Sequence, residues 1–232
     1  MTQYQLRYSK QAKHLQLKFS YRGLELIVPH KRKISECEIQ KFIDDKKVWI
    51  EKHQAKFARD IATHPLLPTK IELTSVNQIW TIKYLKTTSN KLLVHANPMQ
   101  ELVLFGPIDN SEGCLLALRH WLRHVAYVLL EPELKRLSTL TGLIYKNLTI
   151  RNNITRWGSC SAQKNISLCC KLLFIEAELM QHVILHELCH TKYMHHGRAF
   201  QQLLLKWDPH TLRHAKALND RANSIPSWVF SP

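Results

Sequence analysis

Over residues 15–28, apolar residues alternate with residues that are mostly polar, on either side of a short Tyr-Arg-Gly segment. Pro29 ends the pattern. Alternation with a period of two around a turn predicts a β-hairpin. Ser35 and Glu38 then have the spacing of a capping box, and apolar residues recur at helical spacing as far as Ile50. This second pattern predicts a helix over residues 35–58.

A proline-containing loop at residues 64–69 marks a change in the pattern. After it, short apolar stretches separated by turn residues predict strands at residues 71–73, 79–85, 92–96 and 102–105. Residues 110–138 then carry one apolar stripe at helical spacing, which predicts a long helix with a kink at Pro132. The stripe consists of Leu115, Leu118, Leu122, Val125 and Leu129.

The last third of the chain alternates short strands with helices. Residues 147–151 and 165–169 are expected as strands that flank the segment Arg-Trp-Gly-Ser-Cys-Ser at residues 156–161. Helices are expected at residues 176–194, 200–207 and 211–219, and residues 221–232 are expected as a tail. The sequence contains no internal repeat.

One of these helices carries a His-Glu-x-x-His motif, formed by His186, Glu187 and His190. Residues four apart lie on the same face of a helix, so the two imidazoles can share one metal ion while the Glu187 carboxylate points to the side. This is the arrangement in which two histidines bind zinc and a carboxylate acts as general base on a metal-bound water. Glu187 favours a catalytic site, because structural zinc sites have four protein ligands and need no base.

A third ligand is expected just after the helix. His196 follows His190 by six residues, as in the longer zinc motif H-E-x-x-H-x-x-G-x-x-H, although Tyr193 stands where that motif has glycine. His195 is the competing candidate. His182 lies one turn before His186 but too far along the helix axis to meet the same ion, so it is interpreted as a core residue or a partner of a ligand. Five further histidines are expected to face solvent: His53, His120, His124, His210 and His214.

Composition limits the partners and the location. The net charge of +15 and the pI near 9.7 fit a basic surface that attracts nucleic acid, nucleotides or acidic protein, or one that serves solubility alone. No apolar run is long enough for a membrane span, and the N-terminus lacks the apolar region of a secretory signal, so we expect a cytoplasmic protein with no membrane partner. The six cysteines show no regular spacing and are expected as reduced thiols.

Together these motifs resemble those of a known family. They are the hairpin that ends in Val28 and Pro29, Thr-Arg-Trp-Gly-Ser-Cys-Ser at residues 155–161, His-Glu-Leu-Cys-His at 186–190 and His-Gly-Arg-Ala-Phe at 196–200. The chain resembles the YgjP-like members of the SprT-like zinc metallopeptidase group over most of its length. The resemblance implies an α+β fold, with a zincin-like unit in which helices back a twisted, mainly antiparallel sheet.

The resemblance also implies roles for individual residues. Zn²⁺ would be bound by His186, His190 and His196, and Glu187 would activate water. The segment at residues 156–161 would lie near the metal, where Arg156 could bind an anionic group and the Gly158 backbone could approach a substrate. Trp157 and Cys160 in that segment are interpreted as packing residues.

The chain departs from the family pattern in two places. Met194 and His195 stand where family members usually have a Pro-Asn or similar pair, which keeps His195 open as a ligand or as a hydrogen-bond partner of one. Residues 63–110 are longer than the family needs and are interpreted as an insertion with a role of its own. We therefore expect a β-rich region with one helix over residues 1–110, a zinc-binding region over 111–220 and a tail over 221–232.

Three functions fit these observations. The first is a zinc-dependent hydrolase of polypeptides, with Glu187 as general base and with Arg156 or His195 steadying the oxyanion. The second is a metal-dependent nucleoside triphosphate pyrophosphohydrolase; the chain has no P-loop, so arginine, lysine and a divalent ion would recognise the phosphates. The third is a DNA-associated zinc module with little or no turnover, which would bind nucleic acid through its basic surface.

Overall fold

A computed structural model describes residues 4–9, 12–20, 23–30, 34–52, 67–153, 155–222 and 224–230. The chain divides into two compact units, one within Met1–Leu66 and the other Leu67–Phe230. The division lies in the proline-containing loop, so the strands that follow this loop fold with the motif helix and not with the N-terminal residues. The sequence-based division at residue 110 placed them in the N-terminal region.

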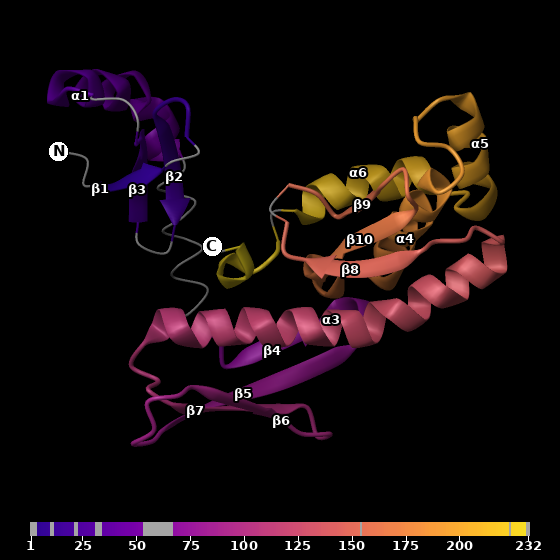
Figure 1. The fold of residues 1–232 in the computed structure, drawn as a ribbon, viewed down its shortest axis with the longest axis horizontal. Helices are drawn as coiled ribbons and strands as arrows, with labels where there is room; N and C mark the ends of the chain where they lie inside the picture. Colours follow the sequence, from indigo (N-terminus) through magenta and orange to yellow (C-terminus); the bar gives the residue numbers. More distant parts are fainter. Residues whose placement is uncertain are drawn as a thin grey trace. The chain divides into compact units, whose positions relative to one another are not determined.

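The first unit is a small sheet with a helix (Figure 1). Its strands are β1 (Gln5–Ser9), β2 (Gln16–Ser20) and β3 (Gly23–Pro29), in the order β1-β3-β2. β2 and β3 form the expected antiparallel hairpin, and β1 pairs with β3 in parallel. Leu24, Leu26 and Val28 of β3 are buried together with Ile39 and Ile43 of the helix, which makes a small separate core.

That helix, α1 (Glu36–Asp45), begins at the expected capping residue. The Ser35 hydroxyl accepts a hydrogen bond from the Glu38 backbone N–H at 3.3 Å, which satisfies a donor at the helix start. Residues 47–52 are helical again after a break at Lys46, and residues 53–58 of the predicted helix lie outside the described residues.

The second unit begins with a four-stranded sheet. Its strands are β4 (Lys70–Leu73), β5 (Gln78–Lys86), β6 (Leu93–Ala96) and β7 (Glu101–Gly106), in the order β4-β5-β7-β6. All four match predicted strands. A short 3-10 helix, η1 (Thr74–Val76), joins β4 to β5. The β5–β7 pair is parallel and the other two pairs are antiparallel.

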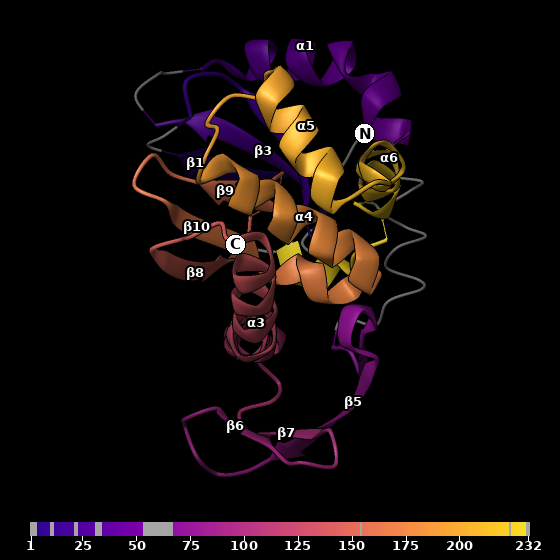
Figure 2. The same ribbon diagram turned by 90° about the vertical axis from the view of Figure 1, so that its right-hand side faces the viewer.

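A second sheet carries the Trp-Gly-Ser-Cys segment. It consists of β8 (Asn147–Arg151), β9 (Gly158–Cys160) and β10 (Asn165–Cys169), in the order β8-β10-β9, and is followed by the 3-10 helix η2 (Cys170–Phe174). The motif helix α4 (Ala177–His190) packs on β9 and contacts α5 (Arg198–Trp207) and α6 (Thr211–Arg221) (Figure 2). The edge strand β9 and the helix α6 therefore both lie beside the motif.

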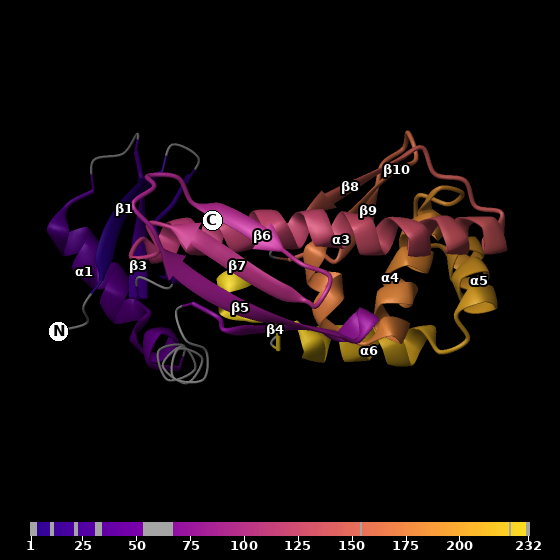
Figure 3. The same ribbon diagram turned by 90° about the horizontal axis from the view of Figure 1, so that it is seen from below.

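The long helix α3 (Ser111–Thr141) runs along the four-stranded sheet (Figure 3). The Asn110 side chain caps its start by accepting from the Gly113 N–H at 3.0 Å, and Gly142, with a φ of 70°, ends it. α3 bends in its C-terminal half, which contains Pro132 (Figure 1). One hydrophobic core joins this helix to the sheet and to α4, with Leu104, Leu118 and Leu188 among its fully buried members.

The fold is therefore α+β, as the sequence predicts, but its strands form three small sheets instead of one. Residues expected as a tail also take part in the core. The 3-10 helix η3 (Ser227–Phe230) buries Trp228 and Val229, and Arg119 donates a hydrogen bond to the Trp228 carbonyl at 3.2 Å. Large apolar side chains hold this segment against the unit. No helix within the described residues is both long and apolar enough to cross a membrane.

Candidate metal centre

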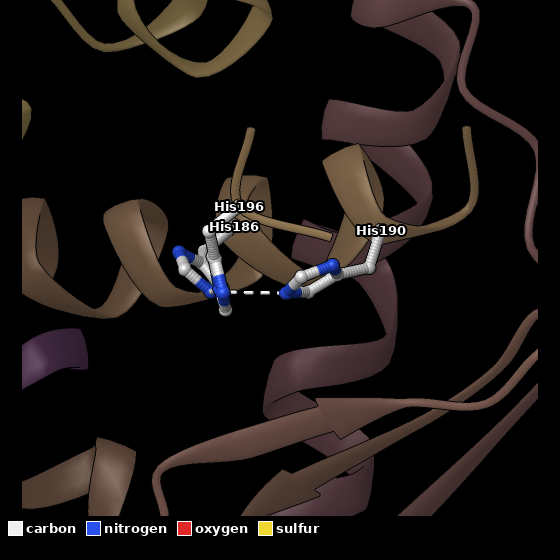
Figure 4. A group of neighbouring side chains, drawn as sticks. All are labelled: His186, His190 and His196. Carbon is white, nitrogen blue, oxygen red and sulfur yellow. Dashed lines mark hydrogen bonds between the residues drawn. The ribbon is translucent and has the colours of Figure 1, made fainter. Parts of the chain in front are cut away.

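Three imidazoles converge at the C-terminal end of α4 (Figure 4). The Nε2 atoms of His186 and His190 are 3.2 Å apart, and the Nε2 atoms of His186 and His196 are 3.0 Å apart. Helical spacing accounts for the first pair, because residues four apart lie one above the other. The third ring comes from the segment that follows the helix.

That segment turns because α4 ends at His190, four residues earlier than the pattern predicts. The Thr191 hydroxyl donates to the Leu188 carbonyl at 2.7 Å, and the N–H groups of Lys192 and Tyr193 donate to the Cys189 carbonyl. These bonds satisfy carbonyls that the helix would otherwise leave open. Tyr193 does not adopt a positive φ, so this turn needs no glycine at that position.

Neighbouring groups fix the orientation of the rings. The Nδ1–H of His190 donates to the Tyr193 carbonyl at 3.1 Å, which leaves the Nε2 lone pair directed at the other two rings. The buried Phe200 ring lies 4.6–5.0 Å from all three imidazoles, centre to centre. The imidazoles therefore have an apolar backing on one side.

The electrostatic environment keeps the buried rings neutral. Burial, assisted by the neighbouring imidazoles, lowers the pKa of His186 to about 3. Burial also lowers the pKa of His190, against the opposing effect of its hydrogen bond to Tyr193. Neutral imidazoles offer lone pairs, which is the state that a metal ion requires of its ligands.

The distances also fit zinc. A tetrahedral ion with Zn–N bonds of about 2.0–2.1 Å holds its nitrogens about 3.3 Å apart. The Nε2 separations of 3.2 Å and 3.0 Å are close to that value. His186, His190 and His196 could therefore hold a zinc ion with little movement, and three protein ligands leave a position for water or substrate.

Glu187 lies beside the three rings with its side chain almost fully buried, at 6% exposure. Burial raises the pKa of the Glu187 carboxyl to about 7, and the charge of Arg156 opposes that shift. Its Oε2 atom has no hydrogen-bond partner among the described residues. An unpaired buried carboxylate is costly for the fold, and such groups occur mainly at functional sites.

A cavity of about 300 Å³ opens beside the motif. Arg156 and Gly158 line it together with Glu187 and His186, and α6 contributes Leu218 to the opposite wall. Gly158 lies directly against Glu187, since a Cβ atom built on it would lie 2.7 Å from Glu187 Oε1. The cavity therefore opens on the Glu187 carboxylate and on His186, one of the three imidazoles.

The structure thus brings Glu187, Arg156 and Gly158 together with the three imidazoles. His195 is different, because it is not a member of the three-imidazole group, whereas His196, which is also exposed, is one. Trp157 and Cys160 are half-buried and pack against the main core, in agreement with their interpretation as packing residues.

Sequence reasoning missed a second group next to this centre. His214, expected to face solvent, is only 12% exposed and bonds to Asp208, which also bonds to His182. Asp208 and His182 are 26 residues apart, and no local motif connects them. The packing of α6 and of the turn that precedes it against α4 brings these side chains together.

Comparison with known families shows to which family the chain belongs. The profile described as "YgjP-like, metallopeptidase domain" matches residues 13–221, which is most of the chain. The chain belongs to the YgjP-like family. Membership of this metallopeptidase family supports a metal-dependent hydrolase, implies a metal that is typically zinc, and implies a polypeptide substrate.

The YgjP-like match includes residues of both units and the whole metal centre. A search of curated proteins and a search of solved structures gave no significant match.

Proposed function

We propose that this chain is a zinc-dependent peptidase in which His186, His190 and His196 bind the ion and Glu187 is the general base. The observation that carries the proposal is a buried carboxylate beside three converging imidazoles: Glu187 Oε2 has no hydrogen-bond partner among the described residues, and one cavity is lined by both Glu187 and His186. Structural zinc sites do not need such a carboxylate.

The ion would supply Lewis acidity, which activates water and polarises the scissile carbonyl. Glu187 accepts the proton of the attacking water and delivers it to the leaving amine. Burial, which raises the pKa of Glu187 to about 7, suits both steps, because a group with a pKa near the working pH can take up and release a proton. Arg156 lies exposed on the cavity wall, where its charge favours negative charge that develops on the substrate.

The sheet beside the cavity supports an extended polypeptide as substrate. β9 is the edge strand of the order β8-β10-β9, and α4 packs next to it. An edge strand offers backbone N–H and C=O groups that can pair with an extended peptide. Gly158, at the start of β9, contacts Glu187, so a peptide paired along this edge would pass close to the base.

The test is the substitution Glu187→Gln. It keeps the shape of the side chain but removes the base, so we expect unchanged zinc content and a loss of polypeptide cleavage of about 10²–10⁴-fold. Glu72→Gln is the matched control, because Glu72 is an exposed carboxylate on β4 that pairs with Lys70. Cleavage by Glu187→Gln at the rate of the unsubstituted chain would contradict the proposed base.

A panel of substrates separates this proposal from its competitors. Purified chain loaded with zinc is incubated with an unfolded polypeptide and with nucleoside triphosphates. Cleaved polypeptide supports the peptidase, whereas pyrophosphate release without cleaved polypeptide replaces it with a nucleotide hydrolase. If neither is hydrolysed and the chain binds DNA with an affinity that falls steeply with salt, the binding module is correct and the peptidase is not.

A further inference from the structure

A second group of ligand-type side chains lies beside the candidate metal centre and shares no residue with it. His182 comes from α4, Asp208 from the turn between α5 and α6, and His214 from α6. The Nδ1 atoms of His182 and His214 lie 2.5 Å and 3.0 Å from the same carboxylate oxygen, Asp208 Oδ2. The ligand atoms of all three side chains lie within 4.8 Å of one another.

The Asp208 carboxylate is held in a defined position. It is buried, at 6% exposure, and its other oxygen, Oδ1, accepts a hydrogen bond from the His210 backbone N–H at 3.0 Å. Such a bond orients a carboxylate in the way that outer-shell partners orient metal ligands. Oδ2 is thereby directed at the two imidazoles.

The group also borders a cavity, of about 280 Å³, that is rich in further donors. Glu178 and Gln181 from α4 and the His210 side chain line it, and Arg213 adds one positive charge. Two carboxylates and three imidazoles therefore surround one small space. Mixed imidazole and carboxylate donors suit zinc and the similar divalent ions of the first transition row.

We infer that His182, Asp208 and His214 form a second binding site for a divalent transition-metal ion, with zinc as the expected occupant. Burial lowers the pKa of His182, so the ring is available in the neutral state that a ligand needs. On binding, each ring carries its proton on Nε2 and presents the Nδ1 lone pair to the ion, while Asp208 supplies the negative charge.

The second site lies where a bound ion would affect the cavity of the first centre. Its ligands join α4 to α6, and His182 lines both cavities, one turn away from His186. α6 also supplies Leu218 and Asn219 to the wall of the larger cavity. An ion at the second site therefore fixes the wall against which a substrate of the first centre would pack.

Zinc stoichiometry tests the inference without any measurement of hydrolysis. Full-length chain is stripped with a chelator, titrated with Zn²⁺ and desalted, and its zinc content is measured. We expect two ions per chain. His214→Gln and Asp208→Asn should each lose the ion of the second site and keep the one at the His186 group. His196→Gln should lose the ion of the His186 group and keep the one at the second site. His95→Gln, at an exposed position outside both groups, should keep both ions.

Two results would overturn the second site: one ion per chain that is unaffected by His214→Gln and Asp208→Asn, or two ions that both substitutions retain. Anomalous scattering at the zinc edge from crystals of the unsubstituted chain covers the case in which the variants fail to fold. A peak among His182, Asp208 and His214 is expected, and its absence from zinc-loaded crystals contradicts the site. Zinc that binds at the second site but not at the His186 group would instead count against the proposed peptidase. The two failures can therefore be told apart.

Discussion

The backbone of Gly158 lies directly against the carboxylate of Glu187, so that a Cβ at position 158 would come within 2.7 Å of Oε1 and 2.8 Å of Cγ. This contact joins the start of β9 to the C-terminal part of α4. It explains how a charged side chain on the motif helix becomes buried, because the strand covers it on the side that faces the sheet. The Trp-Gly-Ser-Cys segment and the His-Glu-x-x-His motif therefore act as one structural element.

Gly158→Ala tests that contact. The added methyl group requires Glu187 or the strand to move, and a small displacement of a catalytic group can cost about 10²-fold in rate. We expect a fall in kcat/KM of at least about tenfold with unchanged zinc content. Gly197→Ala is the control, since Gly197 has a φ of −68° and no atom within 4 Å of its added Cβ. Equal activity of the two variants would show that the contact does not position the base.

The third ligand can be tested by exchanging neighbouring histidines. Both side chains are exposed, but His196 Nε2 is 3.0 Å from His186 Nε2, whereas His195 lies outside the group. Loss of a ligand should weaken zinc binding by more than the 10–100-fold that follows loss of an outer-shell partner. We expect at least about a 100-fold loss for His196→Gln and little change for His195→Gln, measured by competition with a chromophoric chelator. A larger loss of zinc affinity for His195→Gln than for His196→Gln would make His195 the ligand.

A half-buried carboxylate between α3 and α4 should make stability depend on pH. Glu133 accepts hydrogen bonds from Arg136, at 2.8 Å and 2.7 Å, and from Gln181 of α4 at 2.9 Å. The guanidinium of Arg136 holds the pKa of Glu133 below its usual value of 4.5, against the opposing effect of burial. A depressed pKa means that the folded state binds this proton less readily than the unfolded state does, so folding is favoured above pH 4.5.

Glu133→Gln should therefore reduce the free energy of unfolding by about 1 kcal/mol at pH 7. The difference from the unsubstituted chain should shrink as the pH falls from 4.5 through the lowered pKa of Glu133, below which both chains are neutral at this position. Urea unfolding at several pH values measures it. The exposed ion pair of Glu72 serves as reference, since Glu72→Gln should change stability by only about 0–1 kcal/mol. A difference at Glu133 that is constant from pH 7 to pH 3 would exclude this origin.

Local patterns predicted those parts of the site that helix geometry determines. His186 and His190 meet because they are four residues apart on one helix, and alternation predicts β8 and β10, which flank the Gly158 segment, although it does not predict β9 itself. The early end of α4 could not be predicted, because no glycine or proline marks it and it depends on hydrogen bonds of Thr191 and Tyr193. The contact of Asp208 with His182 depends on how the turn between α5 and α6 packs against α4, which no local pattern encodes.

The division into two units also depends on packing that local patterns do not encode. Residues 67–110 were assigned to the N-terminal region because their strands follow its hairpin in sequence. Their inward-facing residues, such as Leu73 and Leu102, share a core with α3 and α4. Alternation along a strand identifies its buried face but not the element that covers that face.

Pro132 offers a test of local strain in α3. Proline has no N–H to donate to the carbonyl four residues earlier, that of Val128, and its ring crowds the same carbonyl. A proline inside a helix costs about 3 kcal/mol relative to alanine in a straight, exposed helix. The cost should be smaller here, because Val128 and Pro132 both lie on the exposed side of α3, where water can bind the open carbonyl.

Leu130 and Leu134, on the two sides of Pro132, are fully buried and fix the path of the helix through the core. Pro132→Ala restores the hydrogen bond without moving these anchors, so we expect the free energy of unfolding to rise by about 1 kcal/mol. Urea unfolding followed by far-UV circular dichroism measures the change, and zinc content should stay the same. Destabilisation by about 1 kcal/mol or more would mean that the bend itself is needed to seat Leu134, because straightening the helix would then move that side chain out of its place in the core.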